Sequence, residues 1–301
     1  MNEKYPKQSE ALVIINPVAG VMNASLMERI ILEHFKKAGW KTTLLYTEKD
    51  TNMGVLLGDY LAKEIDLVVV AGGYGTVASV AAGMVNSKIP LGIVPSGTWN
   101  AIARYLMLPA NPWRALALIT GRHRVRYLDL MSIGNQLHAL NISIGMSANM
   151  IKTSSREQKR KFGNLVYFSN WFKQMTGMKL IRYVIEADGV KYRGRAAEIM
   201  VANYGVVGLN LIEAPLEIHP DDGKADVLIF RPKTVFDVPA MLWQALIKRQ
   251  KRAPKFRQLQ ASKTITIKTR IPMDVQADGE LIGQTPISVN VLARCVGVVV
   301  P

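Results

Sequence analysis

Apolar and polar positions along the first 127 residues follow the pattern of strands and helices that succeed one another. Short runs rich in Val, Ile and Leu indicate buried strands, whereas apolar residues three or four positions apart indicate helices. The predicted strands are ALVIIN, TTLLYT, DLVVV and PLGIVP, at residues 11–16, 42–47, 66–70 and 90–95. The predicted helices cover residues 24–38, 55–64 and 76–85. This alternation predicts an α/β N-terminal domain over residues 1–127, with a parallel sheet covered by helices on both faces.

The pattern changes after about residue 121, where apolar and polar positions alternate strictly. Two stretches alternate across a turn dipeptide, Gly134-Asn135 and Asp188-Gly189, and each is predicted to form a β-hairpin. Further strands are predicted at 225–230, 263–269 and 286–292, and helical stretches near 165–175 and 238–248. We therefore predict an antiparallel, β-sandwich-like C-terminal domain over residues 128–301, with its last strand packing back on the first domain.

Three glycine-containing turns follow predicted strands of the first domain, namely NPVAG at 16–20, GGYGT at 72–76 and PSGTWN at 95–100. Any one of them could be explained by the backbone freedom that a strand-to-helix turn needs. Three turns at the carboxyl ends of parallel strands would converge on one crevice, where N–H groups at helix N-termini favour phosphate. The predicted binding residues are Asn16, Gly72, Gly73, Tyr74, Gly75, Thr76, Gly97, Thr98 and Asn100.

Two turns in the second domain are rich in carboxylates. HPDDGKADV, at 219–227, carries Asp221, Asp222 and Asp226, which could hold a hard cation or could form an acidic turn before a strand. VQADGELIG, at 275–283, carries Asp278 and Glu280, and its Asp-Gly pair also favours a simple hairpin turn.

The formal net charge of +15 predicts an anionic partner, which could be nucleic acid, a nucleotide or an acidic membrane surface. Lys and Arg are concentrated in residues 151–182 and 247–257, and in the first stretch they interleave with aromatic residues. This pattern favours an anionic membrane surface, with a solvated basic face and nucleic acid as alternatives. The single cysteine, Cys295, excludes a disulfide framework. With neither a membrane-spanning run nor a leader in the sequence, we expect a cytoplasmic protein with peripheral membrane association.

Taken in order, the motifs NPxxG, GG-x-GT, P-x-GT-x-N, DDG and DGE resemble the diacylglycerol kinase catalytic-domain family, which includes bacterial lipid kinases and sphingosine kinases. The resemblance implies ATP and Mg²⁺ as cofactors and phosphate transfer to a lipid hydroxyl such as that of diacylglycerol. It also implies that the glycine turns bind the nucleotide and that Asp278 or Glu280 is a general base or metal ligand. The cluster of Asp221, Asp222 and Asp226 would then be a supporting Mg²⁺ site. A homodimer is common among such domains.

The chain departs from the family pattern at the glycine loop, where Tyr74 replaces the aspartate of GGDGT. Ser79 and Ala101 also stand where the family often has carboxylates. A tyrosine is neutral at pH 7 and binds Mg²⁺ poorly. Three functions therefore remain open: a lipid kinase with depressed activity, a nucleotide- or lipid-binding member with little activity, and an enzyme similar to NAD kinase, which shares the loop.

Overall fold

The computed structural model describes residues 9–18, 23–48, 51–63, 65–97, 100–153, 180–204, 206–207, 212–213, 218–231 and 256–301. The chain divides into two compact units. The first unit comprises Met1–Leu130 with Ala293–Pro301, and the second comprises Met131–Leu292. The sequence analysis placed the boundary after residue 127. The predicted helices near 165–175 and 238–248, and most of the two basic stretches, lie outside the described residues.

The first unit is built on a parallel sheet. Its strands are β1 (Glu10–Ile15), β2 (Lys41–Tyr46), β3 (Leu67–Gly72) and β4 (Leu91–Pro95), in the order β2-β1-β3-β4. The end of β18 (Ile287–Val300) pairs in parallel with β4. The predicted parallel α/β sheet is therefore confirmed. In this order β1 and β4 flank β3, so the turns that follow these three strands lie at one edge of the sheet.

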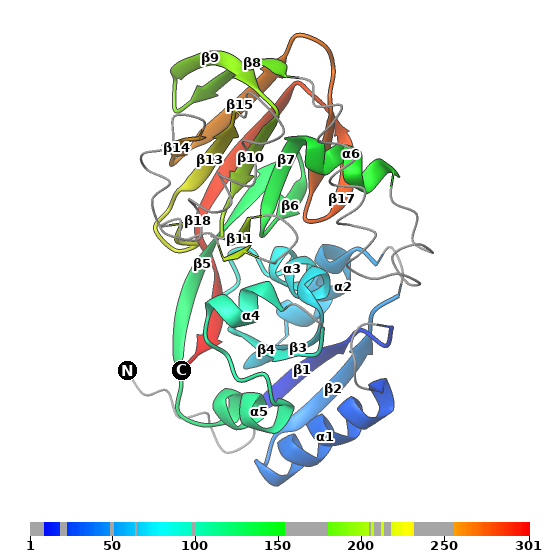
Figure 1. The fold of residues 1–301 in the computed structure, drawn as a ribbon. Helices are drawn as coiled ribbons and strands as arrows, with labels where there is room; N and C mark the ends of the chain where they lie inside the picture. The colour runs from blue at the N-terminus through cyan, green and yellow to red at the C-terminus, as the bar shows by residue number, and fades with distance from the viewer. Residues whose placement is uncertain are drawn as a thin grey trace. The chain divides into compact units, whose positions relative to one another are not determined.

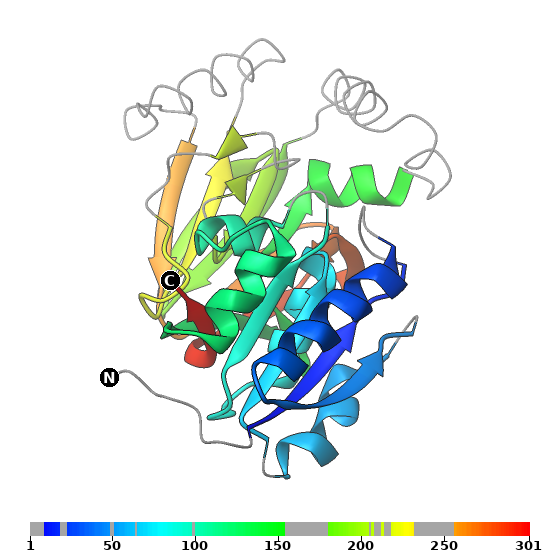
Figure 2. The ribbon, with the colours of Figure 1, turned by 90° about the horizontal axis from the view of Figure 1, so that it is seen from below.

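Helices cover both faces of this sheet (Figure 1). One face carries α1 (Ala24–Lys37) and α5 (Pro112–Thr120), and the other carries α2 (Met53–Leu61), α3 (Tyr74–Gly83) and α4 (Ala101–Tyr105). Figure 2 shows α1 lying along the strands of the sheet. Its buried Ile31 and Phe35 pack with Leu116 of α5 in one apolar cluster, as the helical spacing predicts. The helices α4 and α5 were not among the predicted elements.

The described part of the second unit contains two larger antiparallel sheets, besides one short two-stranded pair. One has the strand order β14 (Phe256–Ala261), β13 (Ala225–Phe230), β10 (Glu198–Ala202), β7 (Asn141–Gly145), β16 (Asp274–Ala277), β17 (Glu280–Gln284). The other comprises the first part of β18, β15 (Thr264–Thr269), β8 (Ile181–Ala187) and β9 (Val190–Ala196). Apolar side chains from both sheets form one core, which includes Ile142, Ile199 and Ile265. This arrangement confirms the predicted antiparallel, sandwich-like fold.

Both predicted hairpins are confirmed. Ile133 of β5 (Arg124–Ile133) pairs with Gln136 of β6 (Gln136–His138), and Ala187 pairs with Val190. The remaining elements are α6 (Met146–Thr153), β11 (Val206–Val207) and β12 (Ile212–Glu213). Within the described part of the chain, no helix combines the length and apolarity needed to cross a bilayer.

Candidate functional site

The first two glycine turns of the first unit are joined by a side-chain hydrogen bond. Asn16 follows β1, and its Nδ2 donates to Thr76 Oγ1, in the first turn of α3, at 2.8 Å. The backbone N–H of Asn16 donates to the carbonyl of Ala71 at 3.1 Å. These bonds hold the end of β1 against the loop between β3 and α3.

The second and third turns approach each other through their backbones. A Cβ atom on Gly97 would lie 2.7 Å from Gly73 Cα, closer than side chains are found. Asn100 closes the third turn, because its Oδ1 accepts from Gly97 N at 3.0 Å while its Nδ2 donates to the Gly97 carbonyl at 2.6 Å. Asn100 has a left-handed backbone with φ 42°, which asparagine tolerates better than most residues. Gly97 is therefore required by the packing of the two turns.

The N-terminus of α3 is open to an anion. Its N-cap residue, Gly73, provides no side-chain hydrogen bond, and the first turn carries no acidic residue. Gly75 is exposed, and a Cβ atom there would meet nothing within 4 Å. The protein's own packing therefore does not require a glycine at this position, although its bare backbone suits the close approach of a phosphate. Half-buried Tyr74 is the first residue of the helix.

The structure thus brings together Asn16, Gly73, Thr76, Gly97 and Asn100, as the three turns predicted. Gly72 lies at the end of β3 beneath Thr76, where a Cβ would be 2.7 Å from Thr76 Cβ. Thr98 lies outside the described residues. That these residues bind a nucleotide stays a prediction.

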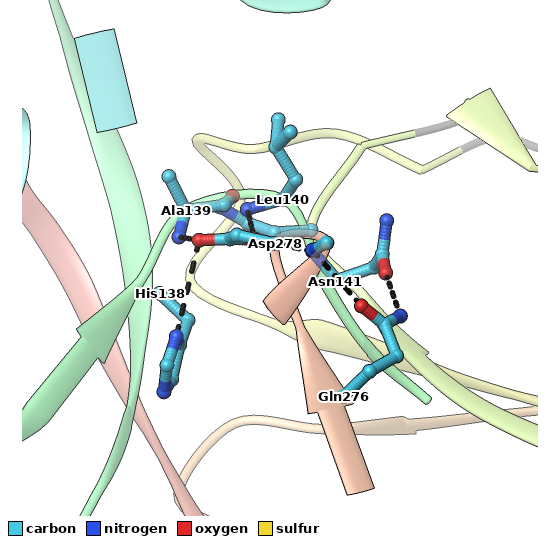
Figure 3. A network of polar contacts seen from close by, with 8 residues as sticks. His138, Ala139, Leu140, Asn141, Gln276 and Asp278 are labelled. Carbon is cyan, nitrogen blue, oxygen red and sulfur yellow. Dashed lines mark hydrogen bonds and ion pairs between the residues drawn. The ribbon is translucent and has the colours of Figure 1, made fainter. Parts of the chain in front are cut away.

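In the second unit, Asp278 sits at the hairpin turn between β16 and β17 and accepts three backbone hydrogen bonds (Figure 3). The donors are the N–H groups of Ala139, Leu140 and Asn141, at 2.8, 2.9 and 3.1 Å. Asp278 has φ 50°, a conformation that this short polar residue tolerates. Its carboxylate therefore ties the turn to the segment that leads into β7. Glu280, the first residue of β17, is exposed.

Gln276, buried one position before the end of β16, fixes the other side of the same turn. Its Nε2 donates to Asn141 Oδ1 at 2.8 Å (Figure 3). The same Nε2 donates to Ser143 Oγ at 2.9 Å, and the Oε1 atom of Gln276 accepts from Gly279 N at 2.9 Å. Asn141 and Ser143 are two residues apart on β7 and so face the same side. A buried polar network with satisfied bonds holds a turn in one geometry.

His138 Nδ1 lies 3.9 Å from Asp278 Oδ2 (Figure 3). Burial lowers the pKa of His138, and the opposing attraction of the Asp278 carboxylate is the smaller effect. The Nε2 atom of His138 is buried and, among the described residues, has no hydrogen-bond partner. Burial therefore favours the neutral form of the imidazole.

Two family models match the chain. The diacylglycerol kinase catalytic domain matches residues 10–133, and the YegS C-terminal NAD kinase beta sandwich-like domain matches residues 141–300. The second match alone covers more than half of the 301 residues. The chain belongs to the family of the YegS C-terminal NAD kinase beta sandwich-like domain, and its residues 10–133 match the diacylglycerol kinase catalytic domain.

Individual relatives agree with this assignment. A Staphylococcus carnosus protein named "Putative lipid kinase" is 28% identical, over 75% of this chain and 74% of its own length. An uncharacterized protein of Synechocystis sp. is 26% identical, over 96% of this chain and 70% of its own length. A crystal structure named as that of a "putative diacylglycerol kinase" from Bacillus anthracis superposes with a TM-score of 0.80. It covers 99% of this chain and 98% of its own, and its 24% identity shows the fold alone.

The structure also describes the three aspartates predicted to support a metal ion. Among the described residues, no three His, Cys, Asp or Glu side chains are grouped so that they could hold a metal. Asp226 is buried, accepts from Gln258 Nε2 at 2.7 Å, and has its pKa raised by burial. Asp222 is exposed and accepts from Lys224 N at 3.0 Å, which makes an acidic turn before β13. That Asp221, Asp222 and Asp226 support a Mg²⁺ ion stays a prediction.

The sequence analysis did not single out Gln276, Asn141, His138 or Glu198. Polar residues at alternate positions of LHALNISIG, where the other positions are apolar, were an available signal for Asn141 and Ser143. No local pattern distinguishes buried Gln276 from an exposed glutamine, because its partners Asn141 and Ser143 lie 135 and 133 positions away along the chain.

Gly97→Ala and Gly75→Ala are expected to separate the packing role of the loop from its binding role. Gly97→Ala forces a Cβ against Gly73 and is expected to cost about 1–3 kcal/mol in the free energy of unfolding. Gly75→Ala adds a better helix former in open space, so stability is expected to stay or rise by about 0.5 kcal/mol. It is nevertheless expected to weaken ATP binding roughly tenfold by blocking the backbone. Urea unfolding measures the free energy of unfolding of each variant, and calorimetric titration measures its ATP affinity. Unchanged ATP affinity in Gly75→Ala would contradict the phosphate site.

Asp278→Asn is expected to lower the free energy of unfolding by about 3 kcal/mol at pH 7. The amide nitrogen would face a backbone donor, so the turn loses charge-assisted hydrogen bonds. Glu280→Gln is the matched control, since its side chain is exposed and a change within about 0.5 kcal/mol is expected. Equal stability of the two variants in urea unfolding would show that Asp278 does not anchor the turn.

Proposed function

We propose that the protein is an ATP-dependent lipid kinase that transfers the γ-phosphate of ATP to a lipid hydroxyl such as that of diacylglycerol. The observation that carries the proposal is the open N-terminus of α3, where exposed Gly75 leaves the backbone bare beside the apposed turns of Gly73 and Gly97. The match of residues 10–133 to the diacylglycerol kinase catalytic domain supports a kinase-type enzyme, and such domains use ATP and usually a divalent cation.

In the proposed reaction, the lipid hydroxyl oxygen forms a bond to the γ-phosphorus while the bond from that phosphorus to the bridging oxygen breaks, which releases ADP. The backbone N–H groups at the start of α3 hold the phosphates, and Asn16 and Asn100 keep the turns in place. Mg²⁺ that arrives with ATP would neutralise phosphate charge.

The hydroxyl proton passes to a carboxylate, for which Asp278 and Glu280 are the candidates. Both oxygens of Asp278 already accept backbone hydrogen bonds, whereas Glu280 is exposed. If Glu280 takes the proton, Glu280→Gln lowers kcat without lowering stability.

The decisive experiment measures transfer of labelled γ-phosphate from ATP to a panel of lipid hydroxyls in mixed micelles with Mg²⁺, and to NAD in a parallel reaction. We expect a labelled lipid phosphate such as phosphatidic acid. Label in NAD alone would instead assign an activity similar to NAD kinase. ATP binding without transfer to any acceptor, in the wild type and in Tyr74→Asp alike, would leave a binding protein and overturn the kinase proposal.

A further inference from the structure

A row of three arginines crosses the outer face of the β9-β8-β15 sheet, far apart in sequence but adjacent in space. Arg182 of β8 lies directly opposite Arg195 of β9 in the antiparallel register. On the other side of β8, the backbone N–H of Arg270 donates to the carbonyl of Arg182 at 3.2 Å. All three are exposed. We call Arg182, Arg195 and Arg270 the arginine row.

The next outward-facing positions along the sheet extend this charge. Val184 lies between Arg193 of β9 and Lys268 of β15, both of which are exposed. The first acidic residue along this face of β8 is Glu186, whose Oε2 lies 3.6 Å from Lys191 Nζ. Five cations therefore occupy two neighbouring rows at one end of the sheet. Like charges opposite each other destabilise a sheet, so the arrangement has a cost that an anionic partner would offset.

Two exposed aliphatic side chains lie at the same end of the sheet. Leu180 immediately precedes β8 with 45% of its surface exposed, and Ile271 follows Arg270 with 69% exposed. Cations that bind phosphate together with aliphatic side chains that enter the acyl boundary are the features of an interfacial membrane site. Single-stranded nucleic acid would instead be bound by aromatic side chains that stack on bases. The chain also enters β8 from the basic and aromatic stretch predicted to face a membrane.

We propose that this end of the sheet, formed by the arginine row with Leu180 and Ile271, docks on an anionic lipid bilayer. The arginines contact lipid phosphates while the two aliphatic side chains enter the interface. The proposal rests on the proposed function only for the choice of a lipid surface as the partner, since a lipid kinase must reach its substrate there.

The test measures cosedimentation of the full chain with phosphatidylglycerol vesicles and with phosphatidylcholine vesicles, without ATP. Each cation near an anionic surface contributes about fivefold to partitioning, so R182Q/R195Q/R270Q is expected to weaken binding to phosphatidylglycerol vesicles about 100-fold. The matched control K36Q/K88Q/R122Q removes the same charge from exposed positions of the first unit and is expected to change binding less than about fivefold. The melting temperature of both variants should stay within a few degrees of wild type.

L180S/I271S is expected to weaken vesicle binding even at high salt, where the arginine contribution is screened. Equal loss in the arginine variant and its control would show that net charge alone drives binding and would overturn the proposal. Tighter, arginine-dependent retention on DNA than on vesicles would assign the surface to nucleic acid and also overturn it. The test measures vesicle binding and not turnover. A chain that binds vesicles through the arginine row but transfers no phosphate would contradict the proposed function and leave this proposal intact.

Discussion

Replacement of Tyr74 by aspartate is expected to raise kcat for lipid phosphorylation about 100-fold or more at saturating Mg²⁺-ATP. Tyr74 opens α3 at the edge where the three glycine turns meet, and the resemblance to GGDGT places a carboxylate at this position in the family. A neutral phenol cannot position Mg²⁺ at this site. Neither Ser79 nor Ala101 supplies a carboxylate in its place. An aspartate in the first turn also interacts favourably with the helix dipole.

The gain should depend on Mg²⁺, because a carboxylate without a cation repels the phosphates. The measurement is initial-rate transfer from labelled ATP to diacylglycerol in mixed micelles over a range of Mg²⁺ concentrations. Tyr74→Asn is the control, since it has the size of aspartate without the charge. A wild type as fast as Tyr74→Asp would show that Tyr74 does not depress turnover. Equal activity of the Asn and Asp variants would show that the missing carboxylate is not the cause.

Replacement of Glu198 by glutamine is expected to raise the free energy of unfolding by about 3 kcal/mol at pH 8. Glu198 of β10 is buried, and its Oε2 accepts from Ser147 N, at the start of α6, at 3.1 Å. Its Oε1 is buried and, in the described part of the chain, has no hydrogen-bond partner. Burial raises the pKa of Glu198 to about 7. The hydrogen bonds from Ser147, Met146 and Ser143 act in the opposite direction and lower this pKa.

The folded pKa of Glu198 lies above its unfolded value of 4.5, so the folded state holds the proton more tightly. The stability that this bound proton gives the folded state is therefore fully present below pH 4.5. It declines as the pH rises towards about 7, and above that it no longer changes. Glutamine stays neutral and can still accept from Ser147 N. The difference between wild type and Glu198→Gln in urea unfolding should be near zero at pH 4 and largest at pH 8. A difference that does not vary with pH would refute a buried, protonated Glu198.

Much of the first unit followed from local pattern. The apolar runs before NPVAG, GGYGT and PSGTWN predicted three buried strands, and a parallel sheet necessarily brings their carboxyl ends to one edge. The contact of Asn16 with Thr76 and the close approach of Gly97 to Gly73 follow from that geometry. The hairpins at Gly134-Asn135 and Asp188-Gly189 were predictable because each turn depends on two residues that are adjacent in sequence.

The sequence by itself determined the strands of the parallel sheet, the two hairpins and the position of the glycine turns, because these depend on residues within one element or one turn. Only the tertiary structure decided that Asp278 is held by residues 139–141, that Asp226 is buried against Gln258 while Asp222 is exposed, and that arginines from three strands form one row. The physical reason is that these contacts depend on which strands become neighbours, and local periodicity does not specify which distant polar groups then lie opposite each other.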